Sequence, residues 1–356
     1  MLELLRRLGL PEGFSAQSQS IDSVISWVHI LMLILFIGWG SFFIYTLIRF
    51  RKRPNVSADP KGVKNHYSTY SEAAVAIFEI ILLVGFSFPV WANRVENVPD
   101  PSKSQVIKVV AQQFKWNMRY PGEDGVFGRT SPDLIDDQGL NFIGLDRKDT
   151  YASDDIITTQ GHMHLPIDRD ITVELTTRDV IHSFFIPVMR VKQDAIPGIS
   201  IPFWFTPTKT GSWEIACAQL CGNSHYIMKG YVHVHTQKGF DSYMKALSII
   251  QEIDDYDFTF EAESTLSQVI DSLKKDDSTK AEELAVFALS QAEQAKIDKE
   301  SSGGDDDSWD DWGDDWKLSL LIFIEFFFKR LTFLVEAVCT IYRDLYIRTN
   351  LFRRFS

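Results

Sequence analysis

The stretch of sequence that decides both the fold and the chemistry lies between residues 217 and 228. It reads Cys217-Ala218-Gln219-Leu220-Cys221-Gly222-Asn223-Ser224-His225-Tyr226-Ile227-Met228. Thiols, an imidazole and a thioether gathered so closely suit copper better than magnesium or calcium, which prefer oxygen ligands. Two thiolates can bridge two copper ions, and each ion then takes one terminal imidazole. The stretch therefore predicts a copper site that still lacks one histidine.

His182 is the candidate for the second imidazole. It lies in the apolar, strand-like run 179–187, where a solvated histidine is unusual. Two alternatives stay open here. Cys217 and Cys221 could form a disulfide, and two Cys with two His could hold zinc, although the spacing differs from that of C-x-x-C zinc sites. A lone His182 or Met228 would be an ordinary core residue, so the prediction depends on the whole set.

Two apolar segments precede this site. Residues 24–50 contain no Lys, Arg, Asp or Glu before Arg49, and residues 73–92 form a second run. The first is long enough to cross a hydrocarbon core of about 30 Å. The loop between them is rich in Lys and Arg, so the positive-inside rule predicts that it is cytoplasmic. We expect an outer segment over residues 1–20, then an uncleaved two-helix transmembrane hairpin over 21–98.

Residues 104–238 show the pattern of short strands and turns that is typical of an all-β domain. The expected strands include 105–111, 171–176, 213–216 and 231–235. Turn signals such as Pro197-Gly198 and Thr210-Gly211 separate them. Many short strands favour a β-sandwich or barrel. The long polar stretch 121–161 is expected to be a surface loop, not core.

The last third of the chain differs again. Residues 239–300 have a charged, helical pattern, and residues 301–316 are an acidic linker with seven aspartates and no basic residue. Residues 317–356 form an apolar and basic membrane-associated tail. Polar residues in 317–342 recur every three or four positions, which favours a helix in the membrane interface or docked on a partner subunit, with a third span as the alternative. Cys339 is expected to be a small buried hydrophobe.

The composition limits the class of protein. The chain has 356 residues, a net charge of −12, 45% hydrophobic residues and 13% aromatic residues. So high an apolar content indicates membrane contact. The acidic balance argues against nucleic acid as a partner and suits a basic protein. Three cysteines are too few for a disulfide scaffold.

Residues 20–238 resemble subunit II of cytochrome c oxidase, a subunit of haem–copper oxidases. The stretch 217–228 carries most of the resemblance. It is supported by Ile21-Asp22, Arg49-Phe50-Arg51, Val180-Ile181-His182-Ser183-Phe184 and Val191-Lys192-Gln193-Asp194-Ala195-Ile196-Pro197-Gly198. The resemblance implies a membrane α-helical hairpin followed by an all-β cupredoxin-like barrel. The helical and acidic C-terminal extension after residue 240 lies outside it.

The resemblance also implies a ligand set for a two-copper centre, CuA. The bridging ligands would be Cys217 and Cys221, and the remaining ligands would be His182 and His225 (terminal), Met228 (axial) and the backbone carbonyl of Gln219. The family usually has Glu in place of Gln219, and that side chain ligates a magnesium shared with subunit I. A neutral amide leaves the copper ligand intact but puts the magnesium in doubt.

Further roles follow from the resemblance. Phe114 and Trp116 match the aromatic motif that receives electrons from cytochrome c, although Phe114 replaces the usual Trp. Glu72 matches the glutamate at the mouth of a proton path into subunit I; a plain helix N-terminal carboxylate is the alternative. Asp179 matches one acidic position of the docking surface for cytochrome c.

The function implied is that of the electron-accepting subunit of a respiratory terminal oxidase, a proton-translocating cytochrome c oxidase. Electrons from cytochrome c would pass through CuA to the haem a and haem–copper centres of subunit I, where O2 is reduced to water. The partners implied are oxidase subunits I and III, cytochrome c or a similar donor, and the lipid bilayer. The implied location is the bacterial plasma membrane, with the copper domain on the outer, periplasmic side.

Three rival functions can be separated from this one. A quinol oxidase subunit II lacks copper, so the intact ligand set argues against it. A CuA domain of nitrous oxide reductase would not follow a membrane hairpin. A copper-storage or delivery protein would bind copper without transferring electrons, and its visible and near-infrared spectrum would differ from that of a CuA carrier.

Overall fold

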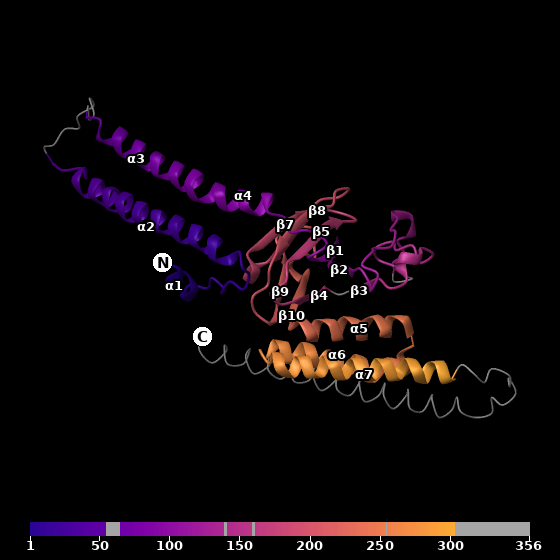
Figure 1. The fold of residues 1–356 in the computed structure, drawn as a ribbon. Helices are drawn as coiled ribbons and strands as arrows, with labels where there is room; N and C mark the ends of the chain where they lie inside the picture. Colours follow the sequence, from indigo (N-terminus) through magenta and orange to yellow (C-terminus); the bar gives the residue numbers. More distant parts are fainter. Residues whose placement is uncertain (55–64, 139–140, 159–160, 254, 303–356) are drawn as a thin grey trace, which may run out of the picture. The chain divides into compact units, whose positions relative to one another are not determined.

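The computed structural model describes residues 1–54, 65–138, 141–158, 161–253 and 255–302. The predicted tail 317–356, with Cys339, and nearly all of the acidic linker lie outside the described residues, as does the middle of the basic loop between the two apolar segments. Figure 1 shows the order of the elements along the described chain.

The predicted hairpin is helical throughout its two apolar segments. A short helix, α1 (Leu2–Arg7), precedes it. Its first arm is α2 (Ser18–Arg49). Its second arm is a continuous helical stretch made of α3 (Tyr67–Leu82), a π-helical turn (Leu83–Ser87) and α4 (Phe88–Glu96). By length and composition, each arm is able to cross a membrane.

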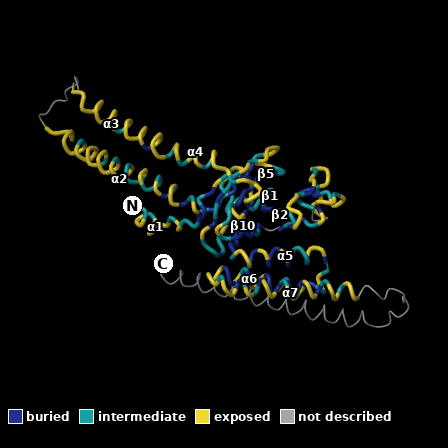
Figure 2. The backbone as a smooth tube through the Cα atoms, in the orientation of Figure 1, coloured by how far each residue is buried: buried dark blue, intermediate teal, exposed yellow. Residues whose placement is uncertain are grey.

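The surface of the hairpin is apolar. Phe36 on α2 is 78% exposed, and Ile48 and Leu83 are more than half exposed. The yellow arms in Figure 2 are these exposed apolar helices. Large apolar side chains covering a whole helix surface are unfavourable in water and favourable against lipid. The exposure therefore supports the prediction that both helices are membrane spans.

Polar contacts join the start of α2 to the β domain. The Arg190 guanidinium donates to the Asp22 carboxylate, with Nε 2.6 Å from Oδ1, and both side chains are buried. Arg190 also donates to the Pro11 carbonyl. The Ser15 hydroxyl donates to the Met189 carbonyl. A buried, bidentate pair of this kind is geometrically specific, so it fixes where the hairpin leaves the domain.

In its described residues, the all-β domain contains ten strands in two sheets, as the predicted sandwich or barrel requires. The first sheet has the order β3-β2-β1-β5-β8 and the second β4-β10-β9-β6-β7. Their bounds are β1 (Gln105–Gln112), β2 (Lys115–Tyr120), β3 (Ile156–Thr158), β4 (His162–Pro166), β5 (Ile171–Thr177), β6 (His182–Ile186), β7 (Val191–Ala195), β8 (Ile201–Phe205), β9 (Gly211–Cys217) and β10 (Lys229–His235). The four strands expected from the sequence are confirmed. The β1–β5 and β4–β10 pairs are parallel, and the other pairs are antiparallel.

The core lies between the two sheets. Alternate residues along the strands, such as Val109, Val173 and Phe184, have no exposed surface. One face of each strand is thus buried, as period-two patterning requires. Short helical turns of 3₁₀ type occur at Pro132–Leu134, Thr150–Ala152, Pro187–Met189 and His225–Ile227. The last of these turns belongs to the 217–228 stretch.

The stretch 121–161 is a surface excursion, but it is more ordered than its polar composition predicts. It contains β3 and a small apolar cluster of Ile143, Leu145 and Ala152. Its root is fixed by the Arg119 guanidinium, which donates to Asp155 and to the Gly128 carbonyl. Arg119 therefore has a structural role.

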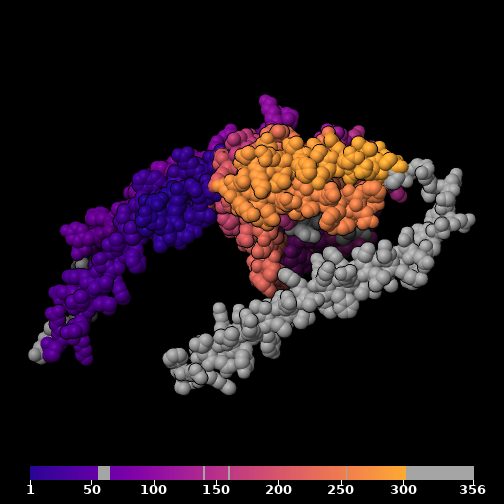
Figure 3. All heavy atoms as spheres, turned by 90° about the horizontal axis from the view of Figure 1, so that it is seen from below, coloured from indigo at the N-terminus to yellow at the C-terminus, as the bar shows by residue number. Residues whose placement is uncertain are grey.

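Between the barrel and residue 302, the described residues form three helices, as predicted for residues 239–300. They are α5 (Gln237–Ile253), α6 (Tyr256–Lys274) and α7 (Ser278–Ser302). Figure 3 shows their orange and yellow atoms as a continuous layer over one side of the β domain. Buried residues such as Phe240 and Val269 belong to the apolar core of the β domain. The helices α5 and α6 are therefore packed parts of this domain.

Candidate metal centre

The candidate site is built at the ends of two paired strands. β6 pairs with β9 so that Phe184 lies opposite Cys217. His182 begins β6, and Cys217 ends β9 where the chain leaves the sheet. The loop that returns to β10 brings back Cys221 and His225. A β-scaffold thus fixes two of the side chains, and one short loop supplies the rest.

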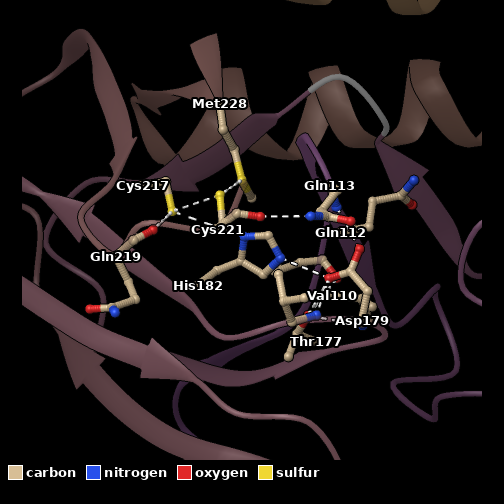
Figure 4. A network of polar contacts seen from close by, with 12 residues as sticks. Val110, Gln112, Gln113, Thr177, Asp179, His182, Cys217, Gln219, Cys221 and Met228 are labelled. Atoms are coloured by element: carbon tan, nitrogen blue, oxygen red, sulfur yellow. Dashed lines mark hydrogen bonds and ion pairs between the residues drawn. The ribbon is translucent and has the colours of Figure 1, made fainter. Parts of the chain in front are cut away.

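The sulfur groups of Cys217, Cys221 and Met228 and the imidazole of His182 converge (Figure 4). Cys217 Sγ lies 3.8 Å from Cys221 Sγ and 3.9 Å from His182 Nδ1. Cys221 Sγ lies 3.4 Å from His225 Nδ1 and 3.7 Å from Met228 Sδ. Within the described part of the chain, His182, Cys217 and Cys221 form the one group of three metal-ligating residues whose donor atoms all lie within 4.8 Å of one another.

The sixth predicted group is also present. The Gln219 carbonyl oxygen lies 3.2 Å from Cys217 Sγ. The Gln219 side chain points away in Figure 4, as expected if only its backbone faces the site. The two cysteines are free, and their separation is far beyond the about 2.05 Å of an S–S bond, so the disulfide alternative is not the state of this structure.

The two thiols differ in acidity. Burial disfavours the Cys217 thiolate, but hydrogen bonds with His182 and with the backbone of Ser183 outweigh it and lower the pKa of Cys217 to about 6. Burial raises the pKa of Cys221 to about 11, and the charge of the neighbouring Cys217 adds to that rise. One thiolate is therefore ready for a soft cation at neutral pH, and the second forms when a cation replaces its proton.

Asp179 orients His182, a role that the sequence did not reveal. His182 Nε2 lies 2.8 Å from Asp179 Oδ1, and His182 is fully buried. The carboxylate also accepts hydrogen bonds from the backbone N–H groups of Gln113 and Val180 and from the Thr177 hydroxyl. A carboxylate held on one ring nitrogen leaves the other, Nδ1, to face the thiols. The feature of the sequence that could have suggested this contact is the short spacing Asp179-x-x-His182.

Gln113 connects this network to the cysteine loop. Its side-chain amide donates to the Cys221 carbonyl at 2.6 Å, while its backbone N–H donates to Asp179. Gly222 makes the approach possible: its φ is +137°, and a Cβ there would lie 2.8 Å from Gln113 Nε2 and 3.1 Å from the Phe114 ring. Phe114 therefore packs directly on the cysteine loop.

Trp116 is placed differently from Phe114. Trp116 has no exposed surface, and its ring makes edge contacts with Phe184 and His182, with centroids 5.1 and 6.1 Å apart. Phe114 is only partly buried. A docked protein can contact Phe114 but not Trp116, so the two aromatic residues predicted to accept electrons are not equivalent.

The remaining predicted residue, Glu72, lies on α3, apart from the centre. Glu72 is exposed near the start of α3 and accepts a hydrogen bond from the Ser68 hydroxyl. Arg178, just before Asp179, donates to Asp137 and to the Phe142 carbonyl.

The comparisons with known proteins agree with this site. A family model described as "Cytochrome C oxidase subunit II, periplasmic domain" matches residues 105–235, which include every proposed copper ligand. An alternative cytochrome c oxidase subunit 2 of Bradyrhizobium diazoefficiens is 34% identical over 145 residues, covering 41% of this chain and 52% of its own length. The match thus spans about half the length of that relative.

One further relative matches over a larger share of the chain, and a solved domain matches over a similar share. A cytochrome c oxidase subunit 2 of Synechocystis is 28% identical over 251 residues, covering 67% of this chain and 75% of its own. The solved periplasmic domain of subunit II of the cytochrome oxidase of Bradyrhizobium japonicum is 30% identical, with 42% of this chain and 94% of that chain covered and a TM-score of 0.30. The family model thus assigns residues 105–235 to the periplasmic domain of cytochrome c oxidase subunit II, and the curated relatives that the chain resembles are themselves cytochrome c oxidase subunits 2.

Proposed function

We propose that this chain is the electron-accepting subunit of a cytochrome c oxidase and that it holds a two-copper CuA centre. The observation that carries the proposal is the convergence of two thiols, two imidazoles and a thioether on one loop and one strand end. When bound, copper supplies one-electron redox chemistry. Cys217 and Cys221 would bridge the pair, His182 and His225 would bind one ion each, and Met228 and the Gln219 carbonyl would complete the set.

The protein around these residues suits electron transfer. Ligands fixed by a β-sheet, a buried imidazole and a hydrogen-bonded loop resist movement, so little rearrangement accompanies a change of charge. Asp179 fixes the ring of His182, and Gln113 fixes the carbonyl of Cys221. Packing of Trp116 against His182 excludes water from one side of the ring. These residues would hold the copper ligands in place during a change of redox state.

Electrons would arrive at the Phe114 side of the centre. Phe114 is the aromatic group that is both partly exposed and packed on the cysteine loop. The donor would be cytochrome c or a protein of similar chemistry, and the acceptors the haem centres of subunit I. Subunit III, proton translocation and the role of Glu72 belong to the same proposal. The proposal does not include a magnesium ion, because the neutral Gln219 amide stands where the family usually has a glutamate carboxylate.

The proposed location follows from the helices and the charges. Two apolar helices anchor the chain, and the basic loop between them would lie in the cytoplasm. The copper domain would then face the outer, periplasmic side of a bacterial plasma membrane, where a soluble donor has access to it.

The proposal is tested on the full-length chain, purified in detergent and loaded with copper. We expect two copper ions per chain and an electron paramagnetic resonance spectrum in which one unpaired electron is shared by two copper nuclei. Cys221→Ser should abolish that spectrum, whereas Ser224→Ala, in the same loop, should keep it. One copper per chain, zinc in place of copper, or a shared-electron spectrum that survives Cys221→Ser would refute the two-copper assignment.

A further inference from the structure

Four histidines form a second buried cluster, on the side of the barrel opposite its core. His162 and His164 lie on β4, and His233 and His235 lie on the neighbouring parallel strand β10, with His233 opposite His164. We call these four residues the histidine ladder. The residues between them, Met163 and Val234, are fully buried in the barrel core, so the ladder occupies the outer face of the sheet.

The ladder is internally hydrogen-bonded. His162 Nδ1 lies 2.9 Å from His233 Nε2, and His164 Nδ1 lies 3.0 Å from His235 Nε2. Each pair shares one proton, which requires one ring to donate and the other to accept. Successive ring centroids along the ladder are 4.9–5.2 Å apart. Each hydrogen bond needs one ring nitrogen that carries no proton, so it is lost when both imidazoles of a pair are protonated.

The C-terminal helices bury the ladder. Tyr243 of α5 stacks on His164 with centroids 4.1 Å apart and also contacts His235. His164, His233 and His235 are each at most 1% exposed, and His162 at the rim is partly exposed. Without α5 and α6, this face would be an ordinary solvent-facing side of a sheet. The ladder therefore forms part of the surface against which these helices pack.

The charged groups that face the ladder do not offset added protons. Lys274 of α6 acts on His162 and His233 with a positive charge, and it pairs with Asp271 where both side chains are more than half exposed. Tyr231 of β10 packs against His162 and His233, with ring centroids 5.5 and 6.4 Å apart. On β9, Glu214 lies opposite Tyr231, beyond the ladder, and pairs with Lys229.

The other polar groups nearby are already engaged. Glu282 of α7 accepts from the Thr236 hydroxyl and pairs with Lys238. The Tyr120 hydroxyl on β2 bonds to the backbone of His164. In the described part of the chain, no carboxylate forms an ion pair with a ladder histidine.

Burial accordingly lowers the pKa of each ladder histidine. The pKa values of His164 and His233 lie well below the ordinary range, and that of His235 is about 3. Burial, followed by the charge of Lys274, also lowers the pKa of His162. An opened state would bind protons near the ordinary pKa of about 6.5. Because the open state then binds more protons than the closed state, acidification favours opening.

We propose that the histidine ladder is an acid-sensitive latch, which holds α5 and α6 on the barrel while its imidazoles are neutral and releases them when the surrounding medium becomes acidic. The ladder is not arranged as a metal site, because one ring nitrogen of each histidine is paired within the ladder and no three donor atoms of the ladder converge among the described residues.

The test uses hydrogen–deuterium exchange on the full-length, copper-loaded chain in detergent, at pH 7.5 and 5.0. Exchange is corrected for the intrinsic effect of pH, and β1 and β5 serve as internal references. Each histidine that is protonated only on opening should shift the opening equilibrium by about thirtyfold between these pH values. We expect α5 and α6 to lose protection at pH 5.0 while β1 and β5 keep theirs.

The variant His164→Gln with His233→Gln should lose most of this pH dependence, whereas His66→Gln, an exposed histidine outside the ladder, should leave it unchanged. If the double variant does not fold, His162→Gln at the rim should reduce the dependence. Equal protection of α5 and α6 at both pH values would overturn the proposal. The proposal would also be overturned if the pH dependence of protection in the ladder variants were as large as in the unmodified chain.

Discussion

The Asp179 carboxylate lies 2.8 Å from Nε2 of His182, on the side of the ring away from the two thiols. The carboxylate is itself held by backbone N–H groups of Gln113 and Val180. The orientation of a proposed copper ligand is therefore set by a residue that the family resemblance assigns to donor docking. In this chain Asp179 is only about a quarter exposed, which limits its contact with any partner.

Replacement of Asp179 tests this role. Asp179→Ala removes the acceptor from His182 Nε2, so we expect copper affinity to fall by about 10–100-fold, the usual cost of losing such a partner. The reduction potential should also change, as measured by spectroelectrochemistry. Asp194→Ala, on the exposed side of β7, removes the same charge without touching a ligand and should leave the affinity unchanged. Equal effects of the two variants would contradict an orienting role.

Gln219 is expected to act through its backbone. Gln219→Ala should retain the full copper content and spectrum, because the carbonyl oxygen beside Cys217 is independent of the side chain. Metal analysis and the near-infrared spectrum of the purified chain check this. Loss of copper in a folded Gln219→Ala variant would show that the side-chain amide is the ligand.

Phe114 and Trp116 should respond differently to truncation. Phe114→Ala should slow electron acceptance from the donor and keep copper, because Phe114 is partly exposed and is not a ligand. Trp116→Ala should instead lower the free energy of unfolding by about 3–5 kcal/mol, because a fully buried ring leaves a cavity. Stopped-flow reduction and thermal unfolding separate the two effects. An unchanged rate in Phe114→Ala would place the docking surface elsewhere.

The metal-free thiols should differ in reactivity. Because the pKa of Cys217 is lowered to about 6 and that of Cys221 is raised to about 11, alkylation of Cys217 should be faster at pH 7 and should decline below about pH 6 as the thiolate is protonated. Mass spectrometry of iodoacetamide-treated, copper-free protein measures both sites. Copper loading should protect both cysteines. Faster labelling of Cys221 than of Cys217 would contradict the assignment.

The buried pair of Arg119 and Asp155 should stabilise the root of the long 121–161 excursion. Asp155→Ala leaves a buried guanidinium without its partner, so we expect a loss of about 3–5 kcal/mol in the free energy of unfolding. Asp137→Ala, which removes the exposed partner of Arg178, is the matched control and should have a much smaller effect. Chemical denaturation with a far-ultraviolet readout compares the two variants.

The sequence by itself determined the order of the domains and the residues of the candidate centre. Apolar runs near residues 24–50 and 73–92 predicted the two helices, because a membrane span needs a continuous apolar length. Short β-like segments separated by turn signals predicted β1, β5, β9 and β10. The soft-donor spacing between Cys217 and Met228 predicted a metal loop, since such ligands lie close together along the chain.

Only the tertiary structure decided how distant residues act on one another. The hydrogen bond of Gln113 to the cysteine loop joins residues 108 positions apart, and no local pattern encodes it. The histidine ladder needed the parallel pairing of β4 with β10, which places His164 opposite His233. Its burial needed α5, whose amphipathic pattern predicts a helix but not the face that it covers. Periodicity reports which side of an element is apolar, whereas pairing and packing between separate elements decide which side chains meet.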